Sequence, residues 1–136
     1  MRLEITRRTD LATRALLHLA ATGERTKSSA LAAAVGTTPG FLSQAMTPLV
    51  AAGWVRSDPG PTGGYTSIAD PAAVSVLDVI EAVEGATDTA TCVLEDRPCS
   101  GAGACALHRP WAAARAHLLD DLGSTPIATL MTSGTL

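Results

Sequence analysis

Residues 36–68 read GTTPGFLSQAMTPLVAAGWVRSDPGPTGGYTSI, a pattern that predicts a helix followed by a β-hairpin. Thr37-Thr38-Pro39 is typical of a helix start, with a capping hydroxyl before a proline at the first helical position. The apolar residues that follow recur every three or four positions up to Gly53, where we expect the helix to stop. Trp54–Ser57 and Tyr65–Ile68 are expected to be strands, because the segment between them is rich in Pro and Gly and favours a turn.

Two further helices are expected before this segment. The first covers residues 9–22, with Thr9 as its cap and an apolar face of leucine and alanine. The second runs from Ser28 or Ser29 to Val35, and Gly36 fits its C-terminal stop.

Pro48 lies inside the third helix and lacks the N–H that a helix interior needs, so we expect the helix to kink or to be split there. Helix, helix, short turn, helix and β-hairpin is the order of a winged helix-turn-helix. In that motif the third helix enters the DNA major groove.

The second half of the chain is expected to contain three more helices. One begins at Ser75 and ends at Gly85, a long one covers residues 110–122, and a short one over residues 126–131 is capped by Thr125. The fold class is therefore mainly α with a small β-hairpin.

Residues 86–109, between these helices, show no clear periodicity and contain all three cysteines. We expect two parts in the chain. Residues 1–70 form a winged helix-turn-helix domain, and residues 71–136 hold the irregular loop of about 86–109 and the later helices.

The charge is distributed unevenly over the 136 residues. The formal net charge of −3 argues against a nucleic-acid binder, but residues 1–57 carry seven Lys/Arg and only three acidic residues. Residues 58–136 carry three Arg and ten acidic residues. A basic front and an acidic back predict two roles in one chain.

The sequence also predicts a cytoplasmic protein without membrane attachment. No apolar run approaches the roughly 20 residues needed to span a bilayer, and the N-terminus lacks a signal-peptide apolar stretch. The number of cysteines is odd and they are crowded together, so a metal or redox site is expected rather than a disulfide framework.

The predicted DNA face combines the third helix, basic residues and the hairpin tip. The helix start offers hydroxyls and an amide that can contact bases or phosphates, namely Thr37, Thr38, Ser43 and Gln44. Phosphate charge is expected from Arg2, Arg7, Arg8, Lys27 and Arg56. The tip has no Lys or Arg, so contact there would come from Thr62 or from backbone amides at Gly63 and Gly64. The alternative is a helical core with a hairpin that binds no DNA.

Cys92, Cys99, Cys105 and His108 form the pattern C-x6-C-x5-C-x2-H. Three Cys and one His could close a tetrahedral zinc site, or three Cys could hold an iron–sulfur cluster with a fourth ligand from elsewhere. The spacing lacks the tight C-x2-C pair of usual zinc sites and suits a cluster better. A zinc-stabilised DNA-binding protein without a sensing role and a thiol redox enzyme are the alternative functions.

Several short motifs occur in a characteristic order. They are Met1-Arg2-Leu3, Thr9-Asp10-Leu11-Ala12-x-Arg14-Ala15-Leu16, Gly63-Gly64-Tyr65, Val79-Ile80-x-Ala82-Val83-Glu84-Gly85, the three cysteines, and Ile127-Ala128-x-Leu130. Together they resemble the Rrf family of bacterial winged-helix iron–sulfur transcription regulators. The resemblance implies a homodimer rather than an enzyme, with the long helix crossing its twin. It also implies that an iron–sulfur cluster on the three cysteines senses redox state, nitric oxide or iron–sulfur status and alters binding to a DNA operator.

The resemblance offers two fourth ligands. In IscR-like members, a histidine at the position of His108 ligates a [2Fe–2S] cluster. Pro110 should keep His108 in the flexible loop, because it pushes Arg109 out of the helix. In NsrR-like members, an aspartate at the position of Asp10 ligates a [4Fe–4S] cluster of the other subunit of the dimer. We favour Asp10 and [4Fe–4S], because a hard carboxylate leaves a labile iron suited to sensing, and keep His108 as the alternative.

Overall fold

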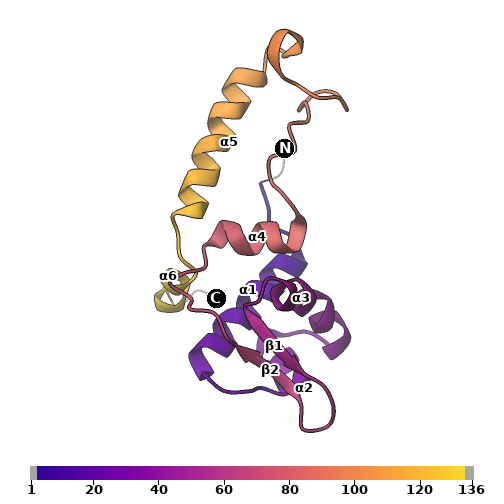
Figure 1. The fold of residues 1–136 in the computed structure, drawn as a ribbon, viewed down its shortest axis with the longest axis vertical. Helices are drawn as coiled ribbons and strands as arrows, with labels where there is room; N and C mark the ends of the chain where they lie inside the picture. Colours follow the sequence, from indigo (N-terminus) through magenta and orange to yellow (C-terminus); the bar gives the residue numbers. More distant parts are fainter. Residues whose placement is uncertain (1–2, 134–136) are drawn as a thin grey trace.

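The computed structural model describes residues 3–133 and shows helices together with a two-stranded antiparallel sheet. The elements in chain order are α1 (Arg7–Thr22), α2 (Ser28–Val35), α3 (Pro39–Ala51), β1 (Val55–Asp58), β2 (Gly64–Ser67), α4 (Val76–Glu84), the 3-10 turn η1 (Gly101–Gly103), α5 (His108–Gly123) and α6 (Ala128–Thr132). Figure 1 shows α1–α4 and the hairpin gathered in one body from which α5 extends. The predicted class, mainly α with a small β-hairpin in winged helix-turn-helix order, is confirmed.

Helix α1 begins two residues earlier than predicted. Thr6 is its cap and accepts a hydrogen bond from the N–H of Thr9. Thr9, which we expected to be the cap, is a buried residue of the first turn instead. Its hydroxyl donates to the carboxylate of Glu84 on α4, so it joins two helices and does not end one.

The turn between α2 and α3 follows the prediction. Gly36 ends α2 in the left-handed conformation at φ 73°, and Thr38 caps α3 by accepting from the N–H of Phe41. Pro48 neither splits nor ends α3, which continues to Ala51. Pro48 is half-buried and Gln44, whose carbonyl lacks the usual N–H partner because of the proline, is an exposed residue.

The hairpin is shifted by about one residue from its predicted bounds. Val55 pairs with Ser67 and Asp58 with Gly64. The N–H and C=O of Tyr65 also bond the C=O and N–H of Thr26, both at 2.9 Å, so the chain before α2 lies against β2 through an isolated β-bridge. This contact fixes the wing to the helical body.

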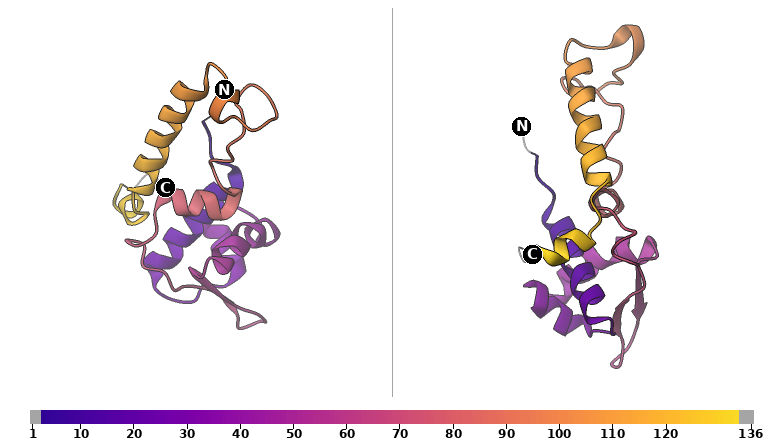
Figure 2. Two further views of the ribbon diagram at one scale, coloured as in Figure 1. Left: turned by 45° about the horizontal axis from the view of Figure 1, so that its top comes forward. Right: turned by 90° about the vertical axis from the view of Figure 1, so that its left-hand side faces the viewer.

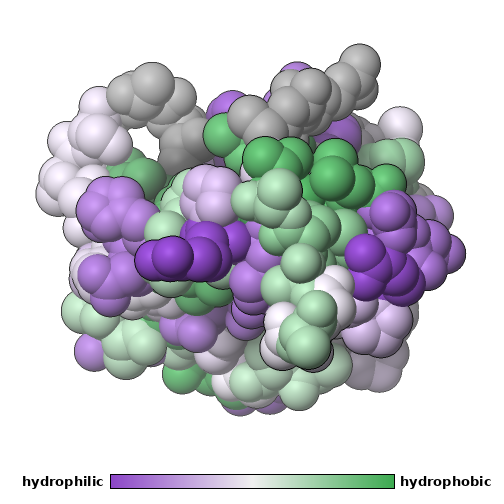
Figure 3. All heavy atoms as spheres, turned by 90° about the horizontal axis from the view of Figure 1, so that it is seen from above, coloured by the Kyte–Doolittle hydropathy of each residue, from purple (hydrophilic) through white to green (hydrophobic). Residues whose placement is uncertain are grey.

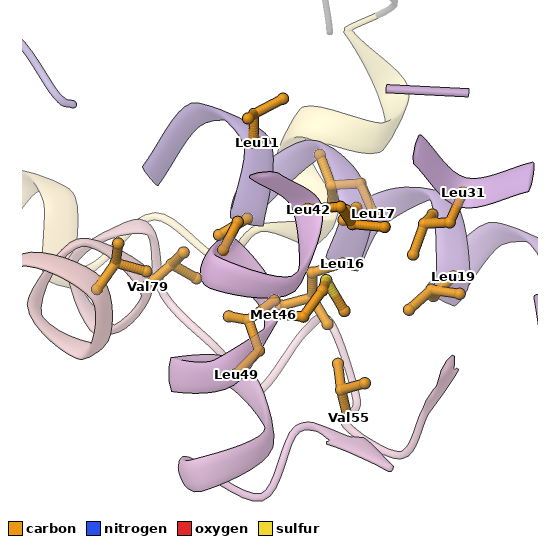
Figure 4. Close-up of a cluster of buried hydrophobic side chains, with 14 of the residues drawn as sticks. Leu11, Leu16, Leu17, Leu19, Leu31, Leu42, Met46, Leu49, Val55 and Val79 are labelled. Carbon is orange, nitrogen blue, oxygen red and sulfur yellow. The ribbon is translucent and has the colours of Figure 1, made fainter. Parts of the chain in front are cut away.

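A single hydrophobic core lies beneath the wing. Figure 4 shows its buried side chains coming together from α1, α2, α3, β1 and α4. Leu11, Leu16, Leu42, Met46 and Leu49 are at most 1% exposed. Full burial of one such side chain stabilises a fold by about 1.5–3 kcal/mol. Val79, Val83 and Ile127 from the second half share this core, so α4 and the chain before α6 are fixed to the first 70 residues.

Helix α5 and the cysteine loop, which we define as residues 86–107, form an arm outside this core. Figure 2 shows the two rising together from the body and meeting at their far end. Viewed from that end, the molecule has a continuous hydrophobic area between hydrophilic ones (Figure 3). No residue of α5 is buried. The arm therefore has an unpartnered surface in the single chain.

Two predicted boundaries in this half are wrong. Helix α5 begins at His108 instead of residue 110, because Pro110 occupies the third helical position, where an N–H has no acceptor within the helix. Helix α6 begins at Ala128, and Thr125 does not cap it; its hydroxyl donates to the C=O of Asp121 at 2.8 Å.

Candidate functional site

The three cysteine sulfurs converge at the far end of the arm. Sγ of Cys105 lies 3.7 Å from Sγ of Cys92 and 3.6 Å from Sγ of Cys99, and all three lie within 4.8 Å of one another. Cys92 and Cys99 are buried and Cys105 is half-buried, and all three are free thiols. Soft thiolates at these separations suit zinc or an iron–sulfur cluster. The donor set is therefore compatible with one shared metal group.

A small backbone bridge in the cysteine loop creates this convergence. Thr91 and Pro98 pair as an antiparallel bridge, flanked by hydrogen bonds from Cys92 N to Arg97 O at 2.8 Å and from Cys99 N to Ala90 O at 3.2 Å. The turn η1 then brings Cys105 back to the other two cysteines. The wide sequence spacing thus closes to one point.

Backbone amides shift the acidity of these thiols. The N–H of Leu94 donates to Sγ of Cys92 at 3.4 Å and is the main reason that the pKa of Cys92 is lowered. Partial burial, together with hydrogen bonds to Cys99 and Cys92, raises the pKa of Cys105. The surroundings of the loop therefore favour the thiolate of Cys92 and disfavour that of Cys105.

His108 lies at the same cavity as the cysteines. This cavity has a volume of about 260 Å³, and α5 contributes His108, Trp111 and Arg115 to its lining. His108 is the first residue of α5 and does not belong to the flexible loop, which corrects our expectation. Within residues 3–133, no histidine nitrogen joins the three sulfurs in a group spanning 4.8 Å.

Asp10 lies on α1, where its two carboxylate oxygens face Arg7 and Arg14 at 2.5 and 2.6 Å. Its side chain is 22% exposed. In the part of the chain that the structure describes, Asp10 does not join the cysteine group. Our expectation placed it opposite the cysteines of a second subunit, an arrangement that a single chain does not contain.

The polar residues predicted for base contacts lie at the start of α3. Ser43 and Gln44 are exposed, Thr37 is half-buried, and the hydroxyl of Thr38 accepts the capping hydrogen bond from Phe41 N. No charged residue lies on α3. This surface offers amide and hydroxyl groups. The positive charge that binds DNA phosphates would have to come from neighbouring elements.

The predicted phosphate-binding residues differ in how they are engaged. Arg7 pairs with Asp10, Arg8 donates to the C=O of Val83, and Arg56 lies 3.4 Å from Asp58. Lys27 precedes α2 and lines a cavity of about 460 Å³ between that helix and the wing. Arg2 lies outside the described residues.

The glycines at the wing have a structural role that the sequence did not reveal. A Cβ on Gly63 would lie 2.0 Å from the C=O oxygen of Asp58, and a Cβ on Gly64 would lie 2.3 Å from that of Thr26. Both positions therefore require glycine for close backbone approach. Thr62 is exposed beside them, and DNA contact by these three residues stays a prediction.

Sequence reasoning missed two features. Phe41 is one of the apolar residues from which we predicted the third helix, yet it is 44% exposed, while the next apolar residue, Leu42, is fully buried. The loop residue Asp88 lies 2.7 Å from Arg115 of α5, an ion pair between residues 27 positions apart that no local pattern predicts.

The sequence profile of the Rrf2 family, described as an iron-dependent transcriptional regulator, matches residues 5–133. The chain belongs to the Rrf2 family. An HTH-type transcriptional regulator of Mycobacterium tuberculosis is 35% identical over 122 residues, which cover 88% of this chain and 75% of that protein. The regulator IscR of Vibrio parahaemolyticus is 33% identical over 92 residues, 68% of this chain and 54% of that protein.

Solved structures of Rrf2-type regulators share the fold. CymR, the global cysteine regulator of B. subtilis, superposes with a TM-score of 0.77 at 24% identity, over 97% of this chain and 98% of that one. T. potens IscR gives a TM-score of 0.71 at 21% identity, over 96% and 88% of the two chains.

Membership in the Rrf2 family makes this chain a transcriptional regulator that binds DNA. Its relatives are regulators and not enzymes, which confirms the expectation that the chain is no enzyme. Within residues 3–133 the structure contains no helix long and apolar enough to cross a membrane.

Proposed function

We propose that this Rrf2 protein is a cytoplasmic, homodimeric repressor or activator that senses redox state, nitric oxide or iron–sulfur status through an iron–sulfur cluster. Cys92, Cys99 and Cys105 hold the cluster. The observation that carries the proposal is the convergence of their sulfurs within 4.8 Å at the end of an arm, in a protein of a family described as iron-dependent. A bound cluster supplies a site where oxidants or nitric oxide react.

The chain's own residues give the cluster site its character. The thiols bind, the Leu94 amide favours the ionised form of Cys92, and burial of Cys92 and Cys99 excludes water from two of three ligands. Binding adds a cross-link between the three thiols of residues 86–107, so loss of the cluster removes that restraint from the loop. The loop and the spacing of the two DNA-reading heads form the two-state element.

The fourth ligand is Asp10 of the partner subunit in a [4Fe–4S] form of the site. To bind, its carboxylate gives up contact with Arg7 or Arg14. His108 is the alternative, with [2Fe–2S], and its place in the lining of the cysteine cavity favours it within one chain. If Asp10→Ala leaves the visible spectrum and cluster lifetime unchanged while His108→Ala alters both, His108 is the ligand.

The partner is a second copy of this chain packed on α5. This 16-residue helix has no buried residue, and its apolar stripe leaves Leu118 39% exposed. A helix with such a stripe is stabilised by burial against another element. The two copies would present two α3 helices to the halves of a palindromic operator.

The DNA face comprises the exposed residues of α3, the wing and Lys27. Gln44 can pair with adenine through two hydrogen bonds, and Phe41 adds an apolar group of the kind that contacts thymine methyls. The division at residue 70 then separates a DNA-reading part from a sensing and dimerising part that share one core.

Anaerobic purification, visible absorption, and iron, sulfide and zinc analysis test the cofactor. The proposal predicts a brown protein with equal iron and sulfide, and a colourless Cys99→Ser variant. A colourless wild type with one zinc per chain contradicts it in favour of a structural zinc site. A wild type free of metal, with one highly reactive thiol, contradicts it in favour of thiol redox chemistry.

A further inference from the structure

In the described part of the chain, a single polar side-chain contact ties the cysteine loop to α5 away from their junction. Oδ1 of Asp88 accepts a hydrogen bond from Nη1 of Arg115 at 2.7 Å. Within residues 3–133, this is the only ion pair or side-chain hydrogen bond that joins the loop to the helix. At the junction itself, backbone hydrogen bonds run from His108 N to Cys105 O and from Trp111 N to Leu107 O, both at 3.0 Å.

The same carboxylate oxygen shapes the chain that leads to the cysteines. Oδ1 of Asp88 also accepts from the N–H of Ala90 at 3.0 Å. Ala90 has a φ of 57°, and it is the only non-glycine residue in the described part of the chain with positive φ. Left-handed conformations are unfavourable for alanine, so the turn needs support from outside it.

The turn at Ala90 is connected to the cysteines through the backbone. The C=O of Ala90 accepts from the N–H of Cys99 at 3.2 Å, and Cys92 follows two residues later. A continuous chain of hydrogen bonds therefore runs from the guanidinium of Arg115 through Asp88 and Ala90 to the backbone of Cys99.

Arg115 also places a positive charge at the cavity of the thiols. Its side chain is 22% exposed and lines the cavity formed with Cys92, Cys99 and Cys105. Asp88 neutralises part of its charge from the side. A cation at a cavity wall stabilises negative charge inside the cavity, and the effect is stronger than in water because the site is partly dry.

We propose that Asp88 and Arg115 are positioning residues that hold the cysteine loop on α5, so that the three thiols converge before any metal binds. In the proposed function, on which this part rests, the charge of Arg115 also favours the reduced, more negative form of the cluster. Because α5 is the proposed dimer helix, the pair links the sensing site to the subunit interface.

The alternative is an ordinary exposed ion pair, which contributes almost nothing to structure. The positioning role and an ordinary ion pair predict different loop protection in the metal-free, reduced, full-length protein. We would measure hydrogen exchange over residues 86–107 and the alkylation rates of the three thiols. Arg115→Ala and Asp88→Ala should each raise these rates about tenfold, the effect expected when a charge-assisted hydrogen bond is lost.

Matched variants test the two side chains of the Asp88–Arg115 contact separately. Arg109→Ala removes an exposed arginine of the same helix, and Asp96→Asn changes an exposed aspartate of the same loop; both should keep wild-type rates. Asp88→Asn keeps an acceptor for Ala90 N and should loosen the loop less than Asp88→Ala. Arg115→Lys keeps the charge and should restore part of the protection.

Thermal unfolding of each variant reports whether the core is intact. Asp88 and Arg115 lie outside the core, so the midpoints should stay within a few degrees of wild type. Wild-type exchange and alkylation rates in both alanine variants would overturn the proposal, whether or not the protein binds a cluster.

The cluster-bound protein gives the second readout. Arg115→Ala should lower the reduction potential of the cluster, and Arg115→Lys should return it toward wild type; an unchanged potential overturns the electrostatic half of the proposal. If the apo loop loosens as expected but no variant and no wild type binds iron and sulfide, the positioning role stands and the proposed sensing function fails.

Discussion

Glu84 connects the last turn of α4 to the first turn of α1. Its carboxylate accepts from the N–H of Thr6 at 2.8 Å and from the hydroxyl of Thr9. Burial raises the pKa of Glu84, but the hydrogen bonds from Thr9 and Thr6 and the charge of Arg8 outweigh it, so the pKa lies below its ordinary value of 4.5. The ionised carboxylate is thus the form that holds the two helices together.

This lowered pKa predicts acid sensitivity. The stabilisation is complete above pH 4.5 and is lost as the pH falls through the lower folded-state pKa. Glu84→Gln should reduce the unfolding midpoint near neutral pH and flatten its decline below pH 4.5. Glu4→Gln, at an exposed position, serves as the control. Equal pH profiles for wild type and Glu84→Gln would show that Glu84 does not matter to this contact.

Gly64 is the residue at which wing and body meet. An alanine there would bring Cβ to 2.3 Å from Thr26 O, at a φ of 146°. We expect Gly64→Ala to destabilise the fold by about 1–3 kcal/mol in urea denaturation, the range for overpacking in a close contact. Gly60→Ala also has positive φ but meets no atom within 4 Å, and it should lose less. An equal loss at both positions would rule out the clash as the cause.

Gln44 and Lys27 should affect DNA binding in different ways. Gln44→Ala should cost about 1–3 kcal/mol on a specific operator and little on random DNA, as for a base-reading side chain. Lys27→Ala should weaken both about equally and reduce the salt dependence of binding. Fluorescence anisotropy titrations at several salt concentrations measure both effects. Equal losses of Gln44→Ala on the two DNAs would show that Gln44 reads no base.

Helix α5 carries an apolar stripe, yet none of its residues is buried in a single chain. Adding a charge to its stripe should prevent burial against a second copy. Leu118→Glu is expected to convert the proposed dimer into a 13.8 kDa monomer in light-scattering measurements. His117→Glu, at a position 81% exposed, should leave the dimer intact. A monomeric wild type, or a dimeric Leu118→Glu variant, would contradict the proposed interface.

The element boundaries show what local sequence patterns can and cannot predict. Gly36, Thr38, Ser75 and Gly85 end or begin their helices as expected, because each acts through bonds within a few residues. The start of α1 was misplaced because both Thr6 and Thr9 are capping residues by type. Only the contact of Thr9 with Glu84, 75 residues away, shows which one is buried.

The cysteine loop illustrates the same limit. The prediction of a metal site followed from three cysteines in fourteen positions, but the bridge between Thr91 and Pro98 and the ion pair of Asp88 with Arg115 could not be predicted. Those contacts depend on how the loop returns along α5. Pro110 was interpreted by its usual effect on the preceding residue, whereas its position in the first turn allows the helix to begin before it.

At the scale of the whole molecule, the basic and acidic halves of the sequence do not separate into two ends in space, because Asp58 of β1 and the acidic residues of α4 belong to the body. The body carries the wing and α3, and the arm carries the cysteines at the opposite end (Figure 1). Several basic residues of the front half are engaged within the chain, since Arg7 pairs with Asp10 and Arg8 bonds the end of α4. The net charge of the front half thus overstates the charge available to DNA.

In the proposed function, the state of the cysteine loop controls DNA affinity at the other end of the molecule. The most direct measurement is the dissociation constant for an operator, selected from random DNA, before and after anaerobic removal of the cluster from the same protein. We expect a change of about 5–150-fold, the usual range of coupling between two sites. A Cys92→Ser/Cys99→Ser/Cys105→Ser variant should stay at the cluster-free value. Identical dissociation constants for the cluster-bound and cluster-free protein would contradict the proposed function.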